Sequence, residues 1–340
     1  MDRQGEERRA RRVNAGVRIG TLGAARIAPM ALIRPARDTD GVSVTAVAAR
    51  DRKRALAFAA KHGVDTVHDD YPSLLADPDI DAVYNPLPNG LHAEWTLKAL
   101  EAGKHVLCEK PFTSNAHEAE EVHRAAENSG RVVMEAFHYR YHPLARRLRD
   151  LVASGELGAP RYLETWMCIP LPLPGDIRYR LDLAGGATMD TGCYAIHLAR
   201  TISGEEPTVV SARAKLASKG VDRAMTVTVR YPSGAEGRIN CSLWSWKLAK
   251  IAALVKLDGG EIRATNPVVP QFFHSLKWRK HGGPWHKEKF PKKPTYTYQL
   301  EAFRDAVGHG KPFPTTTAEA VKNMKVIDAV YRAAGMQPRG

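Results

Sequence analysis

The first 140 residues alternate between short apolar runs and longer segments whose apolar positions recur with helical spacing. The apolar runs, which lack an alternation of polar residues, cover residues 16–22, 42–50, 81–88, 105–111 and 131–137. The helical segments between them each end at a glycine, and they cover residues 51–63, 91–103 and 116–130. Strands that alternate with helices in this way are typical of βαβ crossovers, and continuously apolar strands are typical of a parallel sheet covered on both faces. We therefore expect a parallel, doubly covered sheet in this part of the chain.

The pattern changes after a helical segment at residues 141–155. Strand-like runs follow at residues 161–168, 208–217, 224–232, 235–246 and 251–259. Some of them alternate, for example Thr226, Thr228 and Arg230 between apolar neighbours, which is the signature of an antiparallel sheet with one wet face. Further helices are expected at 186–204, 296–309 and 317–334. The chain thus predicts a second domain of a different class.

Chain length, composition and cysteine spacing restrict the number of domains and the cellular compartment that we expect. A chain of 340 residues is long enough for about two domains, and no apolar stretch approaches the ~18 residues that a membrane span needs. Residues 1–15 lack the apolar core of a signal peptide, and we interpret them as a mobile basic leader. The cysteines are scattered and form no CxxC pair, which indicates reduced thiols, no zinc site and a cytoplasmic location.

The net charge of +13 raises the question of a nucleic-acid partner. Much of the excess lies in the leader and in residues 277–294, where aromatic residues stand among lysines, prolines and glycines. No nucleic-acid-binding module signature accompanies this stretch. We interpret it as a solvated loop or hairpin that could attract an anionic substrate, and expect no nucleic acid and no membrane as partner.

The first strand leads into a turn of small residues, Gly20-Thr-Leu-Gly23-Ala-Ala25-Arg-Ile-Ala28. Residues without bulk let the backbone approach a pyrophosphate, which a helix N-terminus then binds. Gly23, Ala25 and Ala28 occupy the G-x-G-x-x-G spacing between a strand and a helix, so we expect Gly23, Ala25, Arg26 and Ile27 at a dinucleotide. The alternative is a plain contact of small residues between helix and strand.

Arg50, at the end of the second apolar run, favours NADP over NAD. A guanidinium is a planar, permanently charged fork that suits a 2′-phosphate, whereas NAD sites often carry an acidic residue at this position. The neighbouring Asp51 has another role available, as the N-cap of the next helix. NAD stays possible, since Arg50 could instead begin a solvated helix.

Glu109-Lys110-Pro111 ends a strand where ligands of open parallel sheets bind. Lys110 could orient a hydroxyl, polarise a carbonyl or assist a proton transfer. On the helix at 186–204, Asp190, Tyr194 and His197 are spaced i, i+4 and i+7, hence on one face. The phenol could exchange a proton with a substrate hydroxyl, whereas each of these residues alone could be structural.

The chain is similar over nearly its whole length to the glucose–fructose oxidoreductase, inositol dehydrogenase and rhizopine-catabolism (Gfo/Idh/MocA) family. The resemblance rests on GTLGAARIAP, AVAARDRKRALAFAAKHG, VYNPLPNGLHAEW, VLCEKPFTSN, MEAFHYRYHP and GGATMDTGCYAIH. Within the family, the NADP-linked branch of dimeric dihydrodiol dehydrogenase and D-xylose dehydrogenase is the most similar. The implied fold class is α/β, with a Rossmann NAD(P)-binding domain at 16–140. A C-terminal α+β domain at 141–340, for substrate binding and dimerisation, would contain a large, mainly antiparallel open sheet.

The resemblance also assigns roles to residues. The lysine of the EKP triplet and the Tyr of the D-x-G-x-[YH] helix are catalytic in the family, which corresponds here to Lys110 and Tyr194, with Asp190 as the accompanying carboxylate. The family commonly has a cis bond before Pro111. The cofactor side would further include Pro86, Leu87, Pro88, Asn89, His92 and Glu109.

We therefore expect an NAD(P)-dependent, preferentially NADP-dependent, oxidoreductase that interconverts a secondary alcohol and a carbonyl. The partners would be a sugar, polyol or cyclic diol and, as a homo-oligomer, other copies of the chain. The expected substrate side comprises Tyr139, Arg140, Trp166 and His197, with His138, Tyr141, Arg178 and Arg180 as further candidates. Two alternatives stay open, a non-enzymatic dinucleotide sensor and a redox-assisted glycosidase on the same fold. No metal site is expected.

Overall fold

The first half of the chain forms a parallel sheet, as its apolar runs predict. The computed structural model describes residues 16–173, 175–246 and 249–340, so the expected basic leader lies outside the described residues. In the described chain this sheet has six strands in the order β3-β2-β1-β4-β5-β6, all parallel, the order typical of dinucleotide-binding folds. The strands are β1 (Val17–Leu22), β2 (Val42–Ala48), β3 (Thr66–His68), β4 (Ala82–Asn85), β5 (His105–Cys108) and β6 (Val133–Glu135).

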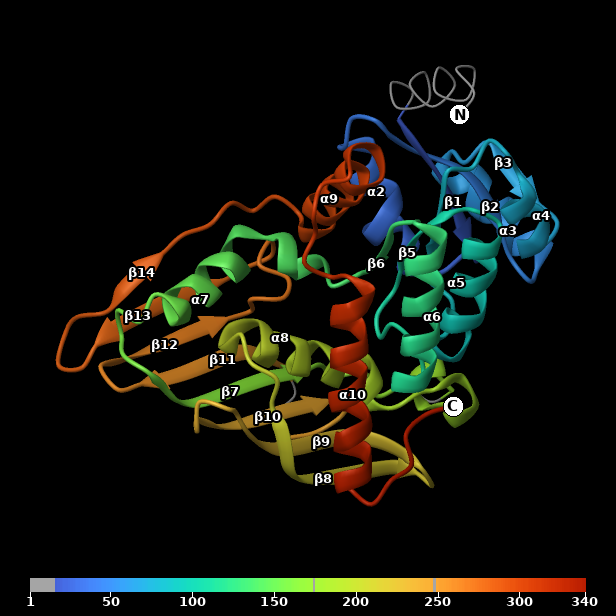
Figure 1. The fold of residues 1–340 in the computed structure, drawn as a ribbon. Helices are drawn as coiled ribbons and strands as arrows, with labels where there is room; N and C mark the ends of the chain where they lie inside the picture. Colours follow the sequence, from blue (N-terminus) through green and yellow to red (C-terminus); the bar gives the residue numbers. More distant parts are fainter. Residues whose placement is uncertain (1–15, 174, 247–248) are drawn as a thin grey trace.

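Helices cover both faces of this sheet (Figure 1). α3 begins and ends as the sequence predicts. Asp51 caps its start by accepting from Lys53 N and Arg54 N, and Gly63 ends it in the left-handed region. The helices and helical turns are η1 (Pro29–Ile33), α2 (Arg34–Arg37), α3 (Arg52–His62), α4 (Tyr71–Ala76), η2 (Asn89–Leu91), α5 (His92–Glu101) and α6 (Ala116–Ser129).

The second half forms a sheet of eight strands within the described residues, in the order β14-β13-β12-β11-β7-β10-β9-β8. Its pairs are antiparallel except β7 with β10, so the expected mainly antiparallel sheet is confirmed. The basic stretch at 277–294 contributes the edge hairpin of β13 and β14. The strands are β7 (Pro160–Cys168), β8 (Thr208–Ser218), β9 (Val221–Arg230), β10 (Glu236–Ser242), β11 (Lys250–Leu257), β12 (Gly260–Thr265), β13 (Ser275–Lys280) and β14 (His286–Glu288).

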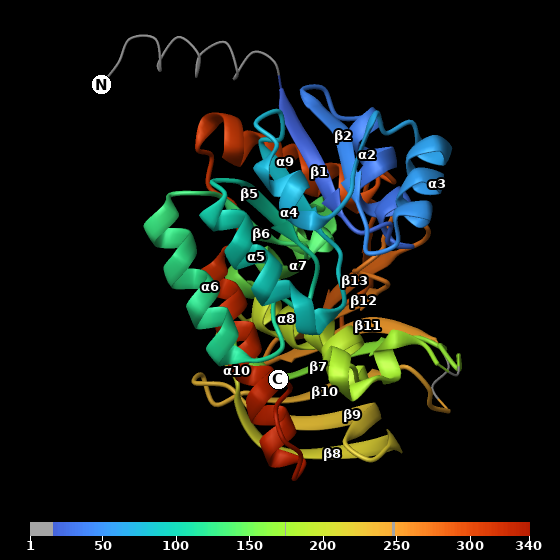
Figure 2. The ribbon, with the colours of Figure 1, turned by 90° about the vertical axis from the view of Figure 1, so that its right-hand side faces the viewer.

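Helices cover one face of the second sheet and fill the junction between the domains (Figure 2). The helix expected at 186–204 begins with a wide π-helical turn, η6, and continues as α8. The helices and turns of this half are η3 (His138–Tyr141), α7 (Pro143–Ala153), η4 (Ile177–Tyr179), η5 (Leu181–Leu183), η6 (Thr188–Gly192), α8 (Cys193–Ser203), α9 (Thr295–His309) and α10 (Thr317–Ala333).

The structure departs from the expected domain range 141–340 at α9. Tyr296, Leu300 and Phe303 on this helix belong to the apolar core beneath β1 and β2, and Figures 1 and 2 both show α9 beside α2. The next helix, α10, packs against α6 of the first domain and against β8 of the second. The Rossmann domain is therefore completed by α9, a helix from the far end of the sequence, and α10 joins the two domains by packing against both.

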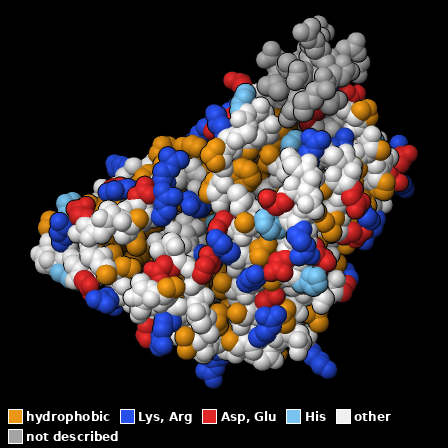
Figure 3. Space-filling view, in the orientation of Figure 1, with side chains coloured by type: hydrophobic (Ala, Val, Ile, Leu, Met, Phe, Trp, Pro, Cys, Tyr) orange, Lys and Arg blue, Asp and Glu red, His pale blue; other side chains and the backbone are white. Residues whose placement is uncertain are grey.

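None of the helices in the described ranges combines the length and the apolar character needed to cross a bilayer. On the face of the molecule shown in Figure 3, Lys and Arg side chains stand among Asp and Glu side chains rather than in one stripe.

Candidate active site

A cavity of about 270 Å³ lies where the two domains meet. Three loops of the Rossmann domain line it, each following the carboxyl end of a strand: the turn after β1, the segment after β4 and the Glu109-Lys110 pair after β5. These loops flank the point between β1 and β4 where the strand order reverses, which is where open α/β sheets bind ligands. The opposite wall comes from β7, η4, η5, η6 and α8 of the second domain.

The turn after β1 has the conformation that the small residues predict. Gly23 has φ +96°, a region that favours glycine, and its N–H donates to Ala48 O at 2.6 Å, which ties the turn to β2. A Cβ on Gly23 would lie 3.3 Å from the Leu87 side chain, inside the space between the two loops. Ala25, Arg26 and Ile27 line the cavity directly. This low-bulk turn fits the pyrophosphate of a dinucleotide.

Arg50 lies just beyond β2, at the exposed edge of the same turn. Its guanidinium has no hydrogen bond or ion pair with any described residue, whereas Arg52 pairs with Asp69 at 2.6 Å and Arg54 donates to Ala24 O. Asp51 is occupied as the helix cap. Of these side chains, Arg50 is therefore the cation left available to an anionic group near the turn.

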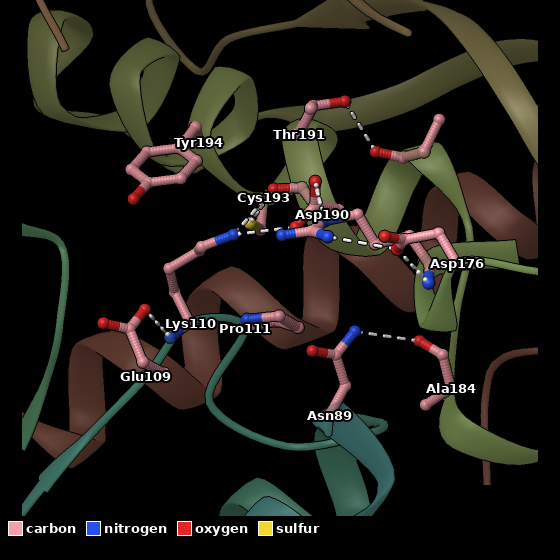
Figure 4. Close-up of polar contacts among 12 residues, drawn as sticks. Asn89, Glu109, Lys110, Pro111, Asp176, Ala184, Asp190, Thr191, Cys193 and Tyr194 are labelled. Carbon is pink, nitrogen blue, oxygen red and sulfur yellow. Dashed lines mark hydrogen bonds and ion pairs between the residues drawn. The ribbon is translucent and has the colours of Figure 1, made fainter. Parts of the chain in front are cut away.

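Lys110 points across the cavity at Asp190 of the second domain (Figure 4). The ammonium donates to an Asp190 carboxylate oxygen at 3.0 Å and to the Asp190 backbone carbonyl at 3.0 Å. Arg178 approaches the other carboxylate oxygen at 3.0 Å. The Lys110–Pro111 peptide is cis, as the resemblance implies. Both Lys110 and Asp190 are largely buried, so the pair is protected from solvent screening.

Each charged group in this cluster stabilises the charged form of its neighbours. Burial alone would lower the pKa of Lys110, but Asp190, with smaller contributions from Cys193 and Glu109, raises that pKa above its ordinary value. Burial alone would raise the pKa of Asp190, but Lys110 and Arg178 hold it below its usual range. The site therefore presents an ammonium beside a carboxylate at neutral pH.

Tyr194 stands one helical turn after Asp190 and lines the same cavity. The Lys110 ammonium lies 4.9 Å from the centre of its ring. Its hydroxyl lies 3.1 Å from His138 Nε2, and burial raises the pKa of the phenol well above its ordinary value. An amine from one domain and a neutral phenol from the other thus meet at one cavity, an arrangement that can hold a substrate oxygen and exchange its proton.

Two contacts between the domains fix the wall of the cavity beside the loops that follow β1 and β4. Asn89 Nδ2 donates to Ala184 O at 3.0 Å, and Arg26 pairs with the buried Asp176 at 2.9 Å. Asp176 in turn accepts from Arg178 at 3.1 Å. The segment that carries η4 and η5 is therefore fastened to both Rossmann loops.

His92 and Glu109 line the cavity as expected, but their polar atoms are already engaged. The two ring nitrogens of His92 lie 2.7 Å from Pro111 O and 2.7 Å from Leu87 O, and burial lowers its pKa to about 4. Glu109 accepts from Tyr84 OH at 2.7 Å, and burial raises its pKa. These side chains brace the loops after β4 and β5. Pro86 and Leu87 also line the cavity, whereas Gly23, Arg50 and Pro88 lie outside its wall.

Tyr139 and His197 do not reach the cavity, contrary to the expectation that they contact substrate. Tyr139 is fully buried and its hydroxyl lies 2.6 Å from His197 Nδ1, while the imidazole stacks on Phe137 at 4.0 Å. His197 shares the helical stripe with Tyr194 but lies almost a turn further along, inside the domain. The pair is a satisfied hydrogen bond in the core, and a substrate role does not fit this geometry.

Trp166 and Arg140 also lie off the cavity wall. Side chains alternate between the faces of a strand, and Met167 of β7 lines the cavity, so Trp166 faces the other side of the sheet. There Lys250 Nζ covers its ring at 3.4 Å. Burial lowers the pKa of Arg140, whose neighbours are Tyr139, Arg149 and Glu319 rather than the cavity.

Several cavity residues carry no signal that would distinguish them in the sequence. Tyr296 comes from α9, far along the chain, and no motif marks it. Arg178 was only one of several arginine candidates. The remaining wall is apolar or small and comprises Met167, Ile169, Ile177, Leu183 and Thr191.

Comparison with known proteins agrees with this two-domain fold. The sequence model of an oxidoreductase family with an NAD-binding Rossmann fold, GFO/IDH/MocA, matches residues 17–137. A model of the C-terminal domain of the same family matches residues 145–263. The two family models therefore match parts of both domains, in the order in which these domains occur along the chain.

Individual relatives extend over most of the chain. The D-xylose 1-dehydrogenase (NADP(+)) 2 of Haloferax volcanii is 39% identical over 319 residues, 93% of this chain and 96% of that protein. The trans-1,2-dihydrobenzene-1,2-diol dehydrogenase of Bos taurus is 36% identical over 203 residues, 59% of this chain and 60% of that protein. A crystal structure of a 3-ketoreductase from Actinomadura kijaniata with NADP and TDP-benzene superposes with a TM-score of 0.86 at 28% identity, covering 94% of this chain and 98% of that chain.

Proposed function

We propose that this chain, which belongs to the GFO/IDH/MocA family of NAD-binding oxidoreductases, interconverts a secondary alcohol and a carbonyl on a sugar, polyol or cyclic diol. The observation that carries the proposal is the meeting of Lys110 and Tyr194, from separate domains, at one cavity beside the dinucleotide turn. The names of the relatives, which include a sugar dehydrogenase and a diol dehydrogenase, support this substrate class.

The chain's own residues supply proton handling and orientation. A bound nicotinamide cofactor supplies the hydride chemistry. The Lys110 ammonium, kept charged by Asp190, donates a hydrogen bond to the substrate oxygen and stabilises the negative charge that develops on it. The Tyr194 hydroxyl exchanges a proton with that oxygen. The apolar wall around Met167, Ile169 and Leu183 excludes water from these groups.

We propose NADP as the preferred cofactor. Arg50 lies at the edge of the β1 turn with a guanidinium that pairs with none of the described residues, and Asp51, the acidic residue beside it, already caps α3. A planar, permanently charged fork suits a ribose 2′-phosphate. The names of the xylose dehydrogenase and of the ketoreductase complex both include NADP.

A homo-oligomer, either a dimer or a tetramer, stays part of the proposal. The edge strand β8 exposes Val210 and Leu216 by 55% and 51%, an apolar surface that a second copy could cover. Light scattering on the purified protein measures this directly, and a monomer at micromolar concentration would contradict it.

A substrate screen tests the function. The protein is incubated with NADP⁺ and D-xylose, other aldoses, polyols or trans-dihydrobenzenediol, and the absorbance of the reduced nicotinamide is followed. We expect turnover with at least one of these, and faster turnover with NADP⁺ than with NAD⁺. Tight NADPH binding without turnover would instead favour a sensor, and cleavage of a glycoside without net reduction would favour a redox-assisted glycosidase.

A further inference from the structure

The hydroxyl of Tyr194 begins a chain of hydrogen bonds that leads away from the cavity. Tyr194 OH lies 3.1 Å from His138 Nε2, and His138 Nδ1 lies 2.8 Å from Thr295 Oγ1. Thr295 Oγ1 lies 3.4 Å from Gln271 Oε1, and Gln271 is only partly buried. Residues from three helical elements and one turn thus connect the buried phenol to the surface.

The donors and acceptors in this chain point in one direction. Gln271 Oε1 can only accept, so the Thr295 hydroxyl donates to it. The Thr295 oxygen then accepts from His138 Nδ1–H, which leaves Nε2 as the acceptor for the Tyr194 hydroxyl. Burial lowers the pKa of His138 to about 3, so the imidazole is neutral and carries one proton. The arrangement favours the Nδ1–H tautomer.

The surroundings hold the His138 ring in place. Its side chain is almost fully buried, and the ring of Tyr296 lies 4.0 Å away. His138 is absent from the wall of the cavity, so it meets the reaction only through Tyr194. His138 is arranged like the histidine of a hydrolase triad. One ring nitrogen accepts from the reacting hydroxyl, and the residue bound to the other ring nitrogen, here Thr295, fixes the tautomer.

We propose that His138 is a positioning and proton-relay residue for Tyr194, held in the Nδ1–H tautomer by Thr295. The inference rests on the proposed function. In the oxidation direction the substrate loses a hydride to the oxidised cofactor, and its hydroxyl proton goes to the Tyr194 oxygen. The phenol's own proton passes to His138 Nε2, and the Nδ1 proton passes to the Thr295 oxygen. The original Thr295 hydroxyl proton, which Gln271 Oε1 holds only by a hydrogen bond, is released to the solvent that the partly buried Gln271 faces. In the reduction direction each transfer is reversed.

A spectroscopic experiment tests the tautomer without substrate or cofactor. Nitrogen-15 NMR of the histidine-labelled full chain is compared with that of His138→Gln, which assigns the His138 signals. We expect a neutral ring with its proton on Nδ1, and loss of that tautomer preference in Thr295→Val. A proton on Nε2, or a charged imidazolium at neutral pH, would overturn the proposal.

Kinetics test the relay itself, with D-xylose and NADP⁺ as the probe. We expect His138→Gln, which can still hold the phenol but cannot relay, to lower kcat about 10- to 100-fold with KM within about threefold. Thr295→Val should lower kcat, and Thr295→Ser should restore it. His123→Gln removes a matched histidine–threonine pair, His123 Nδ1 to Thr317 Oγ1 at 2.8 Å, outside the site and should leave kcat unchanged.

The outcomes separate this inference from the proposed function. If Tyr194→Phe abolishes turnover while His138→Gln and Thr295→Val keep the parental kcat, the relay is wrong and the function stands. If Tyr194→Phe keeps the parental rate, Tyr194 is not the proton-exchanging group and the relay falls with it, whereas the oxidoreductase function fails only if no sugar, polyol or diol is turned over. If the parental protein does not turn over the probe, or His138→Gln fails to fold, the histidine tautomer in the parental protein and in Thr295→Val decides.

Discussion

Lys110 and Asp190, 80 residues apart in the chain, are joined by a 3.0 Å hydrogen bond between an ammonium and a carboxylate. Lys110 follows the carboxyl end of β5 in the Rossmann sheet, and Asp190 lies in the first turn of the helix that carries Tyr194. The same ammonium also holds the Asp190 backbone carbonyl. The candidate site is therefore assembled only when the two domains are packed together.

Replacing Asp190 by Asn should shift the alkaline limit of activity to lower pH. Burial alone lowers the pKa of Lys110, and Asp190 contributes most among the groups that raise it, so the neutral amide leaves the ammonium easier to deprotonate. The pH dependence of kcat/KM for the parental protein and Asp190→Asn measures the effect. Asp182→Asn, which alters an exposed pair with Arg180, is the control. An unchanged alkaline limb in Asp190→Asn would show that Asp190 does not govern Lys110.

Replacing Arg50 by Ala should weaken NADPH binding about 10- to 100-fold and leave NADH binding almost unchanged. A charged hydrogen bond to a phosphate contributes about 1.5–3 kcal/mol, and NADH has no such phosphate. Fluorescence titration of both cofactors measures the Kd values. Arg52→Ala, two residues further along the chain but paired with Asp69, is the matched control. Equal losses for NADH and NADPH in Arg50→Ala would argue against a 2′-phosphate contact.

Replacing Arg339 by Met should destabilise the fold by about 3–5 kcal/mol, the usual cost of removing one partner from a buried ion pair. Arg339 is 2% exposed and pairs at 3.0 Å with the fully buried Asp222. Asp222 also accepts from Thr188 N and Thr188 Oγ1, both at 2.7 Å, at the start of the turn that carries Asp190. Urea unfolding measures the loss. The exposed pair of Arg161 and Asp258 supplies a control, and Arg161→Ala should change stability far less.

Glu135 should make the fold less stable as the pH rises. Burial raises the pKa of this carboxyl from 4.5 to about 8, so between these values the folded chain keeps a proton that the unfolded chain has released. The free energy of unfolding of the parental protein, relative to Glu135→Gln, should fall between about pH 5 and 8 by at most roughly 1.4 kcal/mol per pH unit. It should level off above that range. A difference independent of pH would show that Glu135 is ionised in the fold.

The alternation of strands and helices predicted the Rossmann sheet because its strands are apolar on both faces and its helices are long enough to show a period. β3 and α4 escaped notice because three and six residues carry too little periodicity. β12 was missed although it follows directly on β11 after a tight turn. The position of α9 on the first domain depends on tertiary packing, which no local pattern records.

Residues that line the cavity were predictable where a motif coincided with a strand end or a helix face. Lys110, Asp190 and Tyr194 all line the cavity. Tyr139, His197 and Trp166 were misjudged because the sequence shows that a polar or aromatic residue is near the site, but not which way it points. His138 and Tyr296 acquire their places through contacts between distant segments.

The central claim is that Lys110 and Tyr194 act together on one substrate oxygen. Stopped-flow measurement of hydride transfer in Lys110→Ala, Tyr194→Phe and the double variant, at saturating NADP⁺ and the substrate identified by the screen, tests it most directly. We predict that each variant binds NADPH within a few-fold of the parental protein but transfers hydride about 10²- to 10⁴-fold more slowly. A double variant that transfers hydride at the parental rate would contradict the account.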